Sequence, residues 1–346
     1  MDIFIIYQIY LVFVDIRRVQ ITGGSSYMIT LPKDWAESVN LKKNDPIEIQ
    51  AQTDGSLILF PNGTSSDGQY SVKTIDADKV LDEDFLYRQL IGAYIAGHSR
   101  IKVTSLKQLS STTTNVVSNF TKVSIGMEVL EEDETHVLIK DLMDHTELNP
   151  TKSIERMKVL VKNMLSDVYN AAYTGNMNDI SNMNSKDVEV DRIHWLISRQ
   201  CSIHQKDITL SKKMNLDPCY VTRCLSISRI IERIGDHAVL VSKNLNMLSK
   251  DGKIEGIDKS VCDIGNEIQK LFDTSVAGWL GKNMDVAESC IESGKNTVKR
   301  IKTLFKLNAE TDIEIASATN LIASSSRRIA EYCIDISEQT INAAMD

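Results

Sequence analysis

The chain has 346 residues, which is enough for two or three domains that each bury their own core. Its content of 42% hydrophobic and 25% charged residues is typical of an ordinary soluble protein. The net charge of −8 excludes a protein coated in basic surface, so any contact with nucleic acid needs a local basic patch. The six cysteines form no CxxC motif and have no zinc-like spacing, which indicates reduced thiols in the cytosol.

The first 15 residues, MDIFIIYQIYLVFVD, are mostly apolar and need their own interpretation. The apolar run is shorter than the roughly 20 residues of a membrane-spanning helix. Its only early charge is Asp2, so it does not resemble a signal peptide. Three interpretations stay open: an extra strand or helix, a weak membrane anchor, or upstream sequence included by a wrong start codon. We favour the last, because the interpretable pattern begins at Arg17, and we expect no stable membrane insertion.

Residues 17–61 predict a small β-rich domain with one short helix. The β-prone runs RRVQIT and SYMITL flank a Gly-Gly-Ser turn, and Pro32 opens the helical segment PKDWAESV. PIEIQAQT alternates apolar and polar residues, and an Asp-Gly hairpin turn at 54–55 leads into SLILF. Four short strands and one helical turn bury little surface, so we expect this unit to need a second chain.

Residues 62–150 predict a mixed α/β spacer. After the polar linker NGTSSDG, the segment DEDFLYRQLIGAYIAG predicts a helix that stops at Gly97. IKVTS predicts a strand, SSTTTNVVSNF is compatible with a helix, and GMEVLEED and THVLIKDLM predict a pair of strands. The spacer contains no motif for chemistry.

From Thr151 onwards the strand signals end, and a 3.6-residue periodicity predicts two all-α, tandem three-helix bundles, at 151–250 and 251–346. The six helices are expected at residues 151–173, 176–204, 218–248, 255–279, 281–306 and 311–343. The third helix carries an apolar stripe of Ile227, Ile231, Ile234, Ala238, Val241, Leu245 and Leu248. Alternating spacings of four and three residues are typical of an antiparallel bundle.

The sixth predicted helix repeats the third. RRIAEYCIDIS at 327–337 aligns with ERIGDHAVLVS at 232–242, which places Ile329 on Ile234 and Cys333 on Ala238. The alignment indicates that the two bundles are related by duplication.

Two pairs of acidic residues, each four residues apart, stand out in the first bundle. They are Asp187 and Asp191 in the second helix and Glu232 and Asp236 in the third. The second pair lies about 160° from Ile234 on a helical wheel, opposite the apolar stripe. Like charges at this spacing repel each other. Two explanations stay open. In the first, Arg229 and Arg233 alternate with the acidic residues on a solvent-exposed helix face and balance their charge. In the second, the four carboxylates line an outer groove that binds a metal cation.

A buried di-iron enzyme is not indicated, although such enzymes also use helix bundles. That chemistry needs Glu-x-x-His motifs that project into the core, whereas His237 follows Glu232 by five residues and the acidic residues point outward. We interpret His237 as a neighbouring or surface residue and not as a ligand. The sequence has no P-loop, GxGxxG, HExxH or Ser/His/Asp set, so we expect no enzymatic activity.

The helical part of the chain resembles the PhoU phosphate-uptake regulators. These consist of two tandem three-helix bundles with pairs of acidic E/D-x-x-x-D motifs, often with ERIGD in the third helix. The chain has ERIGD at 232–236 and DVEVD at 187–191. The resemblance implies that Asp187, Asp191, Glu232 and Asp236 hold a metal ion on the outside of the bundle. Iron, zinc, manganese and magnesium are all candidates.

The second bundle departs from the PhoU pattern. Arg327 takes the position of Glu232, Glu331 takes that of Asp236, and the fifth helix offers only Glu288 and Glu292. Because an arginine in the site supplies the cation itself, we expect one metal site per chain.

The N-terminal region resembles SpoVT/AbrB-type domains, in the order β-β-short helix-β-β. The matching residues are VQITGGSSYMITLPKDWAESVNLKKNDPIEIQ, followed by the TDGSLILF hairpin. The resemblance implies an interleaved homodimer that binds double-stranded DNA, often at its backbone. The combination of this domain with a spacer and two bundles is similar to archaeal phosphate-uptake regulators.

Basic residues for DNA contact are few. The expected contacts come from Arg17, Arg18, Lys33, Lys42 and Lys43, and residues 1–62 hold these five bases against seven acids, a net charge of −2. Because phosphate contacts dominate DNA affinity, we expect weak, salt-sensitive binding. The alternative is a dimeric adaptor that binds proteins and never DNA.

The sequence therefore predicts a cytoplasmic, dimeric, non-enzymatic regulator that controls phosphate uptake through transcription, transport or both. The resemblance implies partners such as a phosphate-transporter ATPase or a sensor kinase.

Overall fold

A computed structural model describes residues 15–24, 26–51, 55–61, 72–147, 149–250, 260–304 and 313–345. The chain divides into two compact units, residues 1–69 and 70–346. The apolar run at 1–14, the first turn residue Asp54 and the whole predicted linker NGTSSDG lie outside the described residues. The predicted boundaries near residues 150 and 250 stay predictions.

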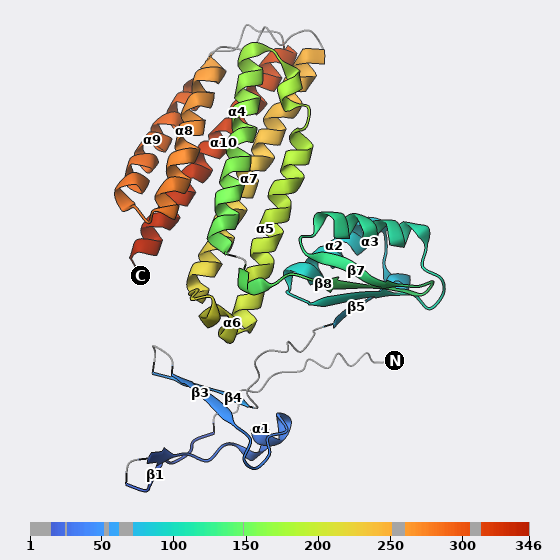
Figure 1. The fold of residues 1–346 in the computed structure, drawn as a ribbon. Coiled ribbons are helices and arrows are strands. Elements are labelled where there is room, and N and C mark those ends of the chain that lie inside the picture. Colours follow the sequence, from blue (N-terminus) through green and yellow to red (C-terminus); the bar gives the residue numbers. More distant parts are fainter. Residues whose placement is uncertain are drawn as a thin grey trace, which may run out of the picture. The chain divides into compact units, whose positions relative to one another are not determined.

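The first unit has the predicted order of strands and helix (Figure 1). Its elements are β1 (Gln20–Thr22), β2 (Ser26–Met28), α1 (Lys33–Ser38), β3 (Ile47–Ala51) and β4 (Leu57–Pro61). β1 pairs antiparallel with β2, and β3 pairs antiparallel with β4. Gly23 and Gly24, both with positive φ, make the first turn.

No side chain is buried in the described part of this first unit. Large apolar side chains are exposed instead, with Ile21 at 68%, Tyr27 at 79% and Ile49 at 62%. A folded unit without a core of its own is stable only when another surface covers these side chains. The prediction that this unit needs a second chain therefore has a physical basis in the structure.

The spacer is a four-stranded sheet with α2 and α3 against one face (Figure 1). Its elements are β5 (Val72–Asp76), α2 (Glu83–Ile95), β6 (Arg100–Thr104), α3 (Ser111–Val123), β7 (Met127–Glu132) and β8 (His136–Asp141). The strand order is β5-β6-β8-β7, with only β5 and β6 parallel. Asp82 and Ser110 cap the two helices, and Gly97 follows the end of α2 with φ +85°.

The predicted helices are present in the rest of the chain. They are α4 (Pro150–Thr174), α5 (Met183–Lys206), α7 (Pro218–Lys250), α8 (Ser260–Leu280), α9 (Met284–Leu304) and α10 (Ile313–Ala344). The second helix was predicted to start at 176, but a 3₁₀ turn at Met177–Ile180 precedes α5, which starts at Met183. A short unpredicted helix, α6 (Ile208–Lys213), follows α5. None of the helices in the described ranges has both the length and the apolar content of a membrane span.

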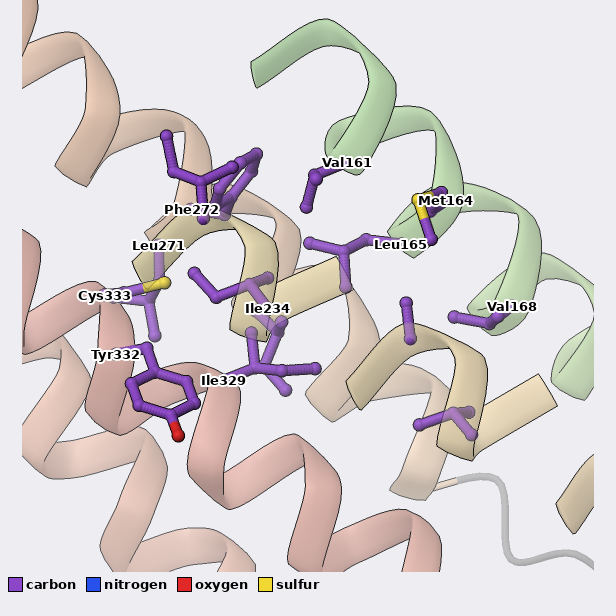
Figure 2. Close-up of a cluster of buried hydrophobic side chains, with 14 of the residues drawn as sticks. Val161, Met164, Leu165, Val168, Ile234, Leu271, Phe272, Ile329, Tyr332 and Cys333 are labelled. Carbon is purple, nitrogen blue, oxygen red and sulfur yellow. The ribbon is translucent and has the colours of Figure 1, made fainter. Parts of the chain in front are cut away.

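One continuous core joins the two bundles. Side chains from α4, α7, α8 and α10 meet in it (Figure 2). The aligned positions Ile234 and Ile329 are both fully buried, and so are Ala238 and Cys333. The repeat found in the sequence thus places equivalent residues of α7 and α10 in the same core.

A buried arginine attaches the spacer to the first bundle. Arg199 of α5 is fully buried, and its guanidinium pairs with Asp141 at the end of β8. It also donates hydrogen bonds to the carbonyl oxygens of Tyr94 and His98, the latter at 2.9 Å. Arg192, two turns earlier on α5, donates to the carbonyl oxygen of Val123 at 2.7 Å. Because a buried charge is costly without such partners, this network fixes the spacer against α5.

Candidate functional site

The four predicted acidic residues lie where α5 and α7 pack side by side. We call Asp187, Asp191, Glu232 and Asp236 the acidic cluster. Gly235 of α7 lies at this contact, where a Cβ atom would lie 3.7 Å from Val190 and 3.8 Å from Oδ1 of Asp187, both ordinary van der Waals distances. Larger side chains at this position would push the two helices apart.

The acidic cluster is more buried than the helical wheel predicted. Asp236 is exposed, but Asp187 and Asp191 are half-buried, and the Glu232 side chain is only 13% exposed.

Tyr87 of α2 lies near the acidic cluster. Burial, followed by the Asp191 carboxylate, raises the pKa of the Tyr87 hydroxyl. Nothing in the sequence pointed to Tyr87, because it lies a hundred residues before the cluster in a segment without a recognisable motif.

Burial and mutual repulsion make these carboxyl groups weaker acids. Burial first, and then the carboxylates of Asp187, Glu232 and Asp236, raise the pKa of Asp191 to about 7. Burial, followed by the carboxylate of Asp236, also raises the pKa of Asp187 and of Glu232. The cluster therefore holds more negative charge than its surroundings stabilise.

Arginines compensate this charge only in part. Nη1 of Arg229 lies 3.2 Å from Oε1 of Glu232, the one ion pair that the cluster makes among the described residues. In the same part of the chain, Oδ1 of Asp187 and Oε2 of Glu232 are buried without a hydrogen-bond partner. Unpaired buried oxygens are costly. A solvated ladder of alternating charges therefore does not account for the whole cluster.

The oxygen atoms of the cluster suit a hard cation. Carboxylates and water are the ligands that such ions take, and the unpartnered oxygens of Asp187 and Glu232 are available. Within the described ranges, however, no three side chains of His, Cys, Asp or Glu form a ready-made metal site. A metal ion here would complete its coordination with water or with a carboxylate in another rotamer.

The equivalent position in the second bundle carries an internal ion pair. Nη1 of Arg327 lies 2.8 Å from Oε1 of Glu331, and Nη1 of Arg328 lies 2.7 Å from Oε2 of the same residue. Both carboxylate oxygens of Glu331 are thus satisfied by arginine. Glu288 and Glu292 of α9 are exposed, and Glu292 pairs with Lys295 at 3.0 Å.

His237 lies where α7 crosses α10. Its ring centroid is 5.9 Å from that of Tyr332, which occupies the equivalent position in the repeat. Burial, followed by the Arg328 charge, lowers the pKa of His237. This packing position agrees with our interpretation of His237 as a neighbour of the acidic residues.

The five predicted DNA-contacting residues are all exposed. Two of them have acidic partners, since Arg17 pairs with Asp15 and Nζ of Lys33 lies 3.6 Å from Oε1 of Glu37. Lys42 and Lys43 lie in the turn between α1 and β3, which Asp45 holds by accepting a hydrogen bond from the Lys42 backbone N–H at 2.7 Å. Exposure favours phosphate contacts, while the ion pairs weaken them.

Two family models match the chain. Residues 154–245, which contain the whole acidic cluster, match the PhoU domain. Residues 20–67 match a model described as antidote-toxin recognition MazE, bacterial antitoxin.

Proteins of similar sequence carry the name phosphate-specific transport system accessory protein PhoU homolog. The one from Borreliella burgdorferi is 26% identical over 209 residues, which cover 58% of this chain and 86% of that protein. The one from Caulobacter vibrioides is 32% identical over 102 residues, 28% of this chain and 42% of that protein.

Two solved structures align with part of the chain. PhoU from Pseudomonas aeruginosa aligns with a TM-score of 0.46 and 16% identity over 57% of this chain and 95% of that chain. The phosphate transport system regulatory protein PhoU from Streptococcus pneumoniae aligns with a TM-score of 0.43 and 16% identity over 56% and 91%.

Proposed function

Because the helical part of the chain is PhoU-like and its N-terminal domain is of the MazE/AbrB type, we propose that the protein regulates phosphate uptake. The observation that carries this proposal is the match of residues 154–245 to the PhoU domain, since that segment contains all four residues of the acidic cluster. The relative from Borreliella burgdorferi, whose name places it in phosphate-specific transport, is covered over 86% of its length. A phosphate-transporter ATPase or a sensor kinase is the expected partner of the bundles, in the cytoplasm.

In this proposal the acidic cluster holds a metal ion. Asp187, Asp191, Glu232 and Asp236 supply carboxylate oxygens from two helices, and a divalent or trivalent cation offsets their repulsion. The bound ion supplies positive charge. The four carboxylates, two from each helix, would then hold α5 against α7 through the ion.

The N-terminal unit serves in this proposal as a homodimerisation and DNA-binding module. The exposed apolar side chains of Ile21, Tyr27 and Ile49 support dimerisation, because a partner chain would cover them. Arg17, Arg18, Lys33, Lys42 and Lys43 are the expected contacts to DNA phosphates. Weak binding at low salt, lost steeply as salt rises, is expected from so few bases.

A dimeric adaptor that does not bind DNA is the second candidate. It is favoured by the acidic partners of two of the five bases, Arg17 with Asp15 and Lys33 with Glu37. In that case the N-terminal unit only joins two chains, and regulation acts through proteins that contact the helical bundles.

Phosphate uptake tests the main proposal. In the organism that carries this chain, deletion of its gene should leave the uptake of radiolabelled phosphate high when phosphate is plentiful. The intact chain should restore the decrease, D191N/E232Q should restore it poorly, and E288Q/E292Q on α9 serves as the matched control. Unchanged uptake in the deletion strain would contradict regulation of phosphate transport.

Fluorescence anisotropy distinguishes the DNA-binding regulator from the adaptor. The full chain is titrated on a labelled duplex from its own upstream region across a series of salt concentrations. Saturable binding that R17A/R18A abolishes and K299A/K302A on α9 retains would support DNA contact by the N-terminal unit. Absence of binding at low salt would favour the adaptor.

A further inference from the structure

The spacer docks on one face of α5 (Figure 1). The contact is made by residues of that helix spaced three or four apart, as expected for a single helix face. They are Arg192, Trp195, Arg199, Ile203 and Lys206. Trp195 packs against the apolar core of the spacer, and a Cβ atom on Gly97 would lie only 2.9 Å from Cγ1 of Ile203. Nζ of Lys206 donates a hydrogen bond to the carbonyl oxygen of Ala96 at 2.6 Å.

Asp191 lies where this docking face meets the acidic cluster. It is one turn after Asp187, which lies against α7 at Gly235, and one turn before Trp195. Residues four apart drift around a helix by about 40°, so this row of side chains turns from α7 towards the spacer. Tyr87 of α2 packs against the same apolar core as Trp195, and the Asp191 carboxylate contributes to its raised pKa. The docked spacer therefore covers Asp191 on the side that α7 leaves free.

The spacer takes water away from Asp191 and gives it little charge compensation in return. Near this carboxylate the spacer contributes Tyr87, which is neutral. Arg192 follows Asp191 in the chain, but its guanidinium pairs with Glu189 and donates to a spacer carbonyl. Other charges that act on Asp191 are the three remaining carboxylates of the acidic cluster and the guanidinium of Arg229. Because covering an ionised carboxylate is costly without a paired cation, an ionised Asp191 opposes docking of the spacer.

We propose that a cation bound in the acidic cluster strengthens the docking of the spacer on α5. The cation offsets the charge of Asp191, so covering this carboxylate costs less free energy. Linkage then requires that docking raise the affinity for the cation by the same factor. The inference rests on the metal site of the proposed function. It adds that the state of the helical bundle is transmitted to the spacer, the part of the chain that follows the N-terminal unit.

Weakening the docking at a distance from the acidic cluster tests this coupling in the full chain. I203E places a charge at the Gly97 contact, about 18 Å along α5 from Asp191. We expect the affinity for Mg²⁺, measured by titration calorimetry, to fall about fivefold.

The matched control is M247E, because Met247 is exposed and lies about 17 Å beyond Asp236 on α7. Both new charges are further from the acidic cluster than the screening length of about 10 Å, so M247E should leave the affinity within about twofold of the original. R199Q, which removes the charged anchor to Asp141, is a second variant that weakens docking.

Fluorine NMR of the chain labelled with 5-fluorotryptophan follows docking directly. Trp195 lies at the spacer contact, Trp35 in the N-terminal unit and Trp279 in the core of the bundles. In I203E we expect a second Trp195 line from the undocked spacer, which saturating Mg²⁺ should reduce about fivefold. I203E/D191N without metal should show the same reduction, because asparagine removes the charge, whereas I203E/E292Q should not. Unchanged lines of Trp35 and Trp279 would confirm that the rest of the chain stays folded.

The outcomes separate the coupling from the metal site. A second Trp195 line that Mg²⁺ leaves unchanged, while calorimetry shows the ion bound, would overturn the coupling and leave the metal site intact. So would an unchanged Mg²⁺ affinity in a variant whose spacer is undocked, or an equal loss of affinity in M247E. Absence of Mg²⁺ binding by the original chain would overturn both the coupling and the metal site.

Discussion

The two bundles place aligned segments of α7 and α10 in the same core, but the charges on these two helices are balanced in opposite ways. In α7, Glu232 and Asp236 face two aspartates of α5, and only one ion pair, with Arg229, forms among the described residues. In α10, Arg327 replaces the glutamate, and Glu331 is satisfied by two arginines at 2.8 and 2.7 Å. The core positions Ile234 and Ile329 are equally buried.

The difference teaches that the fold does not require the acidic cluster. The duplicated helix α10, with its internal arginine, packs as completely as α7, which carries two of the four carboxylates, so the charge arrangement of the first bundle has a separate reason. A cation from outside would satisfy it. Variants that give α7 the charge arrangement of α10, or α10 that of α7, are therefore the most informative.

The largest effect is expected for E232R, which gives the first bundle the arginine of the second. Its guanidinium would pair with Asp236 at i+4, as Arg327 pairs with Glu331, and would occupy the place of the proposed metal ion. We expect metal affinity to fall at least about 100-fold, which corresponds to about 2.7 kcal/mol. Titration calorimetry and metal content after dialysis measure this.

The matched control for E232R is E292R, which makes the same charge change on the exposed face of α9. It should leave metal affinity within about twofold of the original. Full metal content in E232R would contradict metal binding at the acidic cluster.

The pH dependence of stability should also differ between the bundles. Because the pKa of Asp191 is raised to about 7, the folded state holds a proton that the unfolded chain releases near pH 4. The free energy of unfolding of the metal-free protein therefore falls as pH rises from about 4 to 7. We expect a loss on the order of 1–2 kcal/mol after solvent screening.

Thermal unfolding at pH 5 and pH 8 measures this loss. D191N, which is neutral at both values, should show a smaller difference, and E292Q should behave like the original chain. Added Mg²⁺ should reduce the loss at pH 8, since a cation replaces the lost protons. A stability that rises from pH 5 to pH 8 and is unchanged in D191N would contradict the raised pKa.

Local signals predicted most of the helices and the candidate site, and non-local contacts account for what was missed. The apolar stripe around Ile234 and the stop at Gly97 depend on nearby residues, so both could be read from the sequence. Arg199 could not be recognised as buried, because its partner Asp141 precedes it by 58 residues. β5 was missed because VKTID mixes charged and β-branched residues in an edge strand. The burial of the acidic cluster depends on packing of α5, α7 and the spacer, which the helical wheel of one helix does not include.

A smaller effect is expected for R327E, which gives the second bundle the glutamate of the first. Arg327 is partly exposed, so loss of its ion pair and repulsion from Glu331 should cost about 1 kcal/mol or less. No second equivalent of metal should bind, because α9 lacks the aspartate pair of α5. Thermal unfolding and metal stoichiometry measure the two results, with E288Q as the control. A second bound metal ion would show that the glutamate alone creates a site.

The smallest effect is expected for G235A, which introduces the residue found at the equivalent position of α10, the fully buried Ala330. The new Cβ atom would lie 3.7 Å from Val161 and Val190, an ordinary contact, so no clash arises. Alanine favours the helix over glycine by about 1 kcal/mol. Oδ1 of Asp187, 3.8 Å from that methyl group, is already buried, so the methyl group displaces no water from it. The Tm should therefore rise in G235A, as it should in G92A, whose Cβ atom would lie in open space. A loss of Tm in G235A at pH 5 would mean that α5 and α7 require glycine for their approach, and the acidic cluster would then be a consequence of that packing.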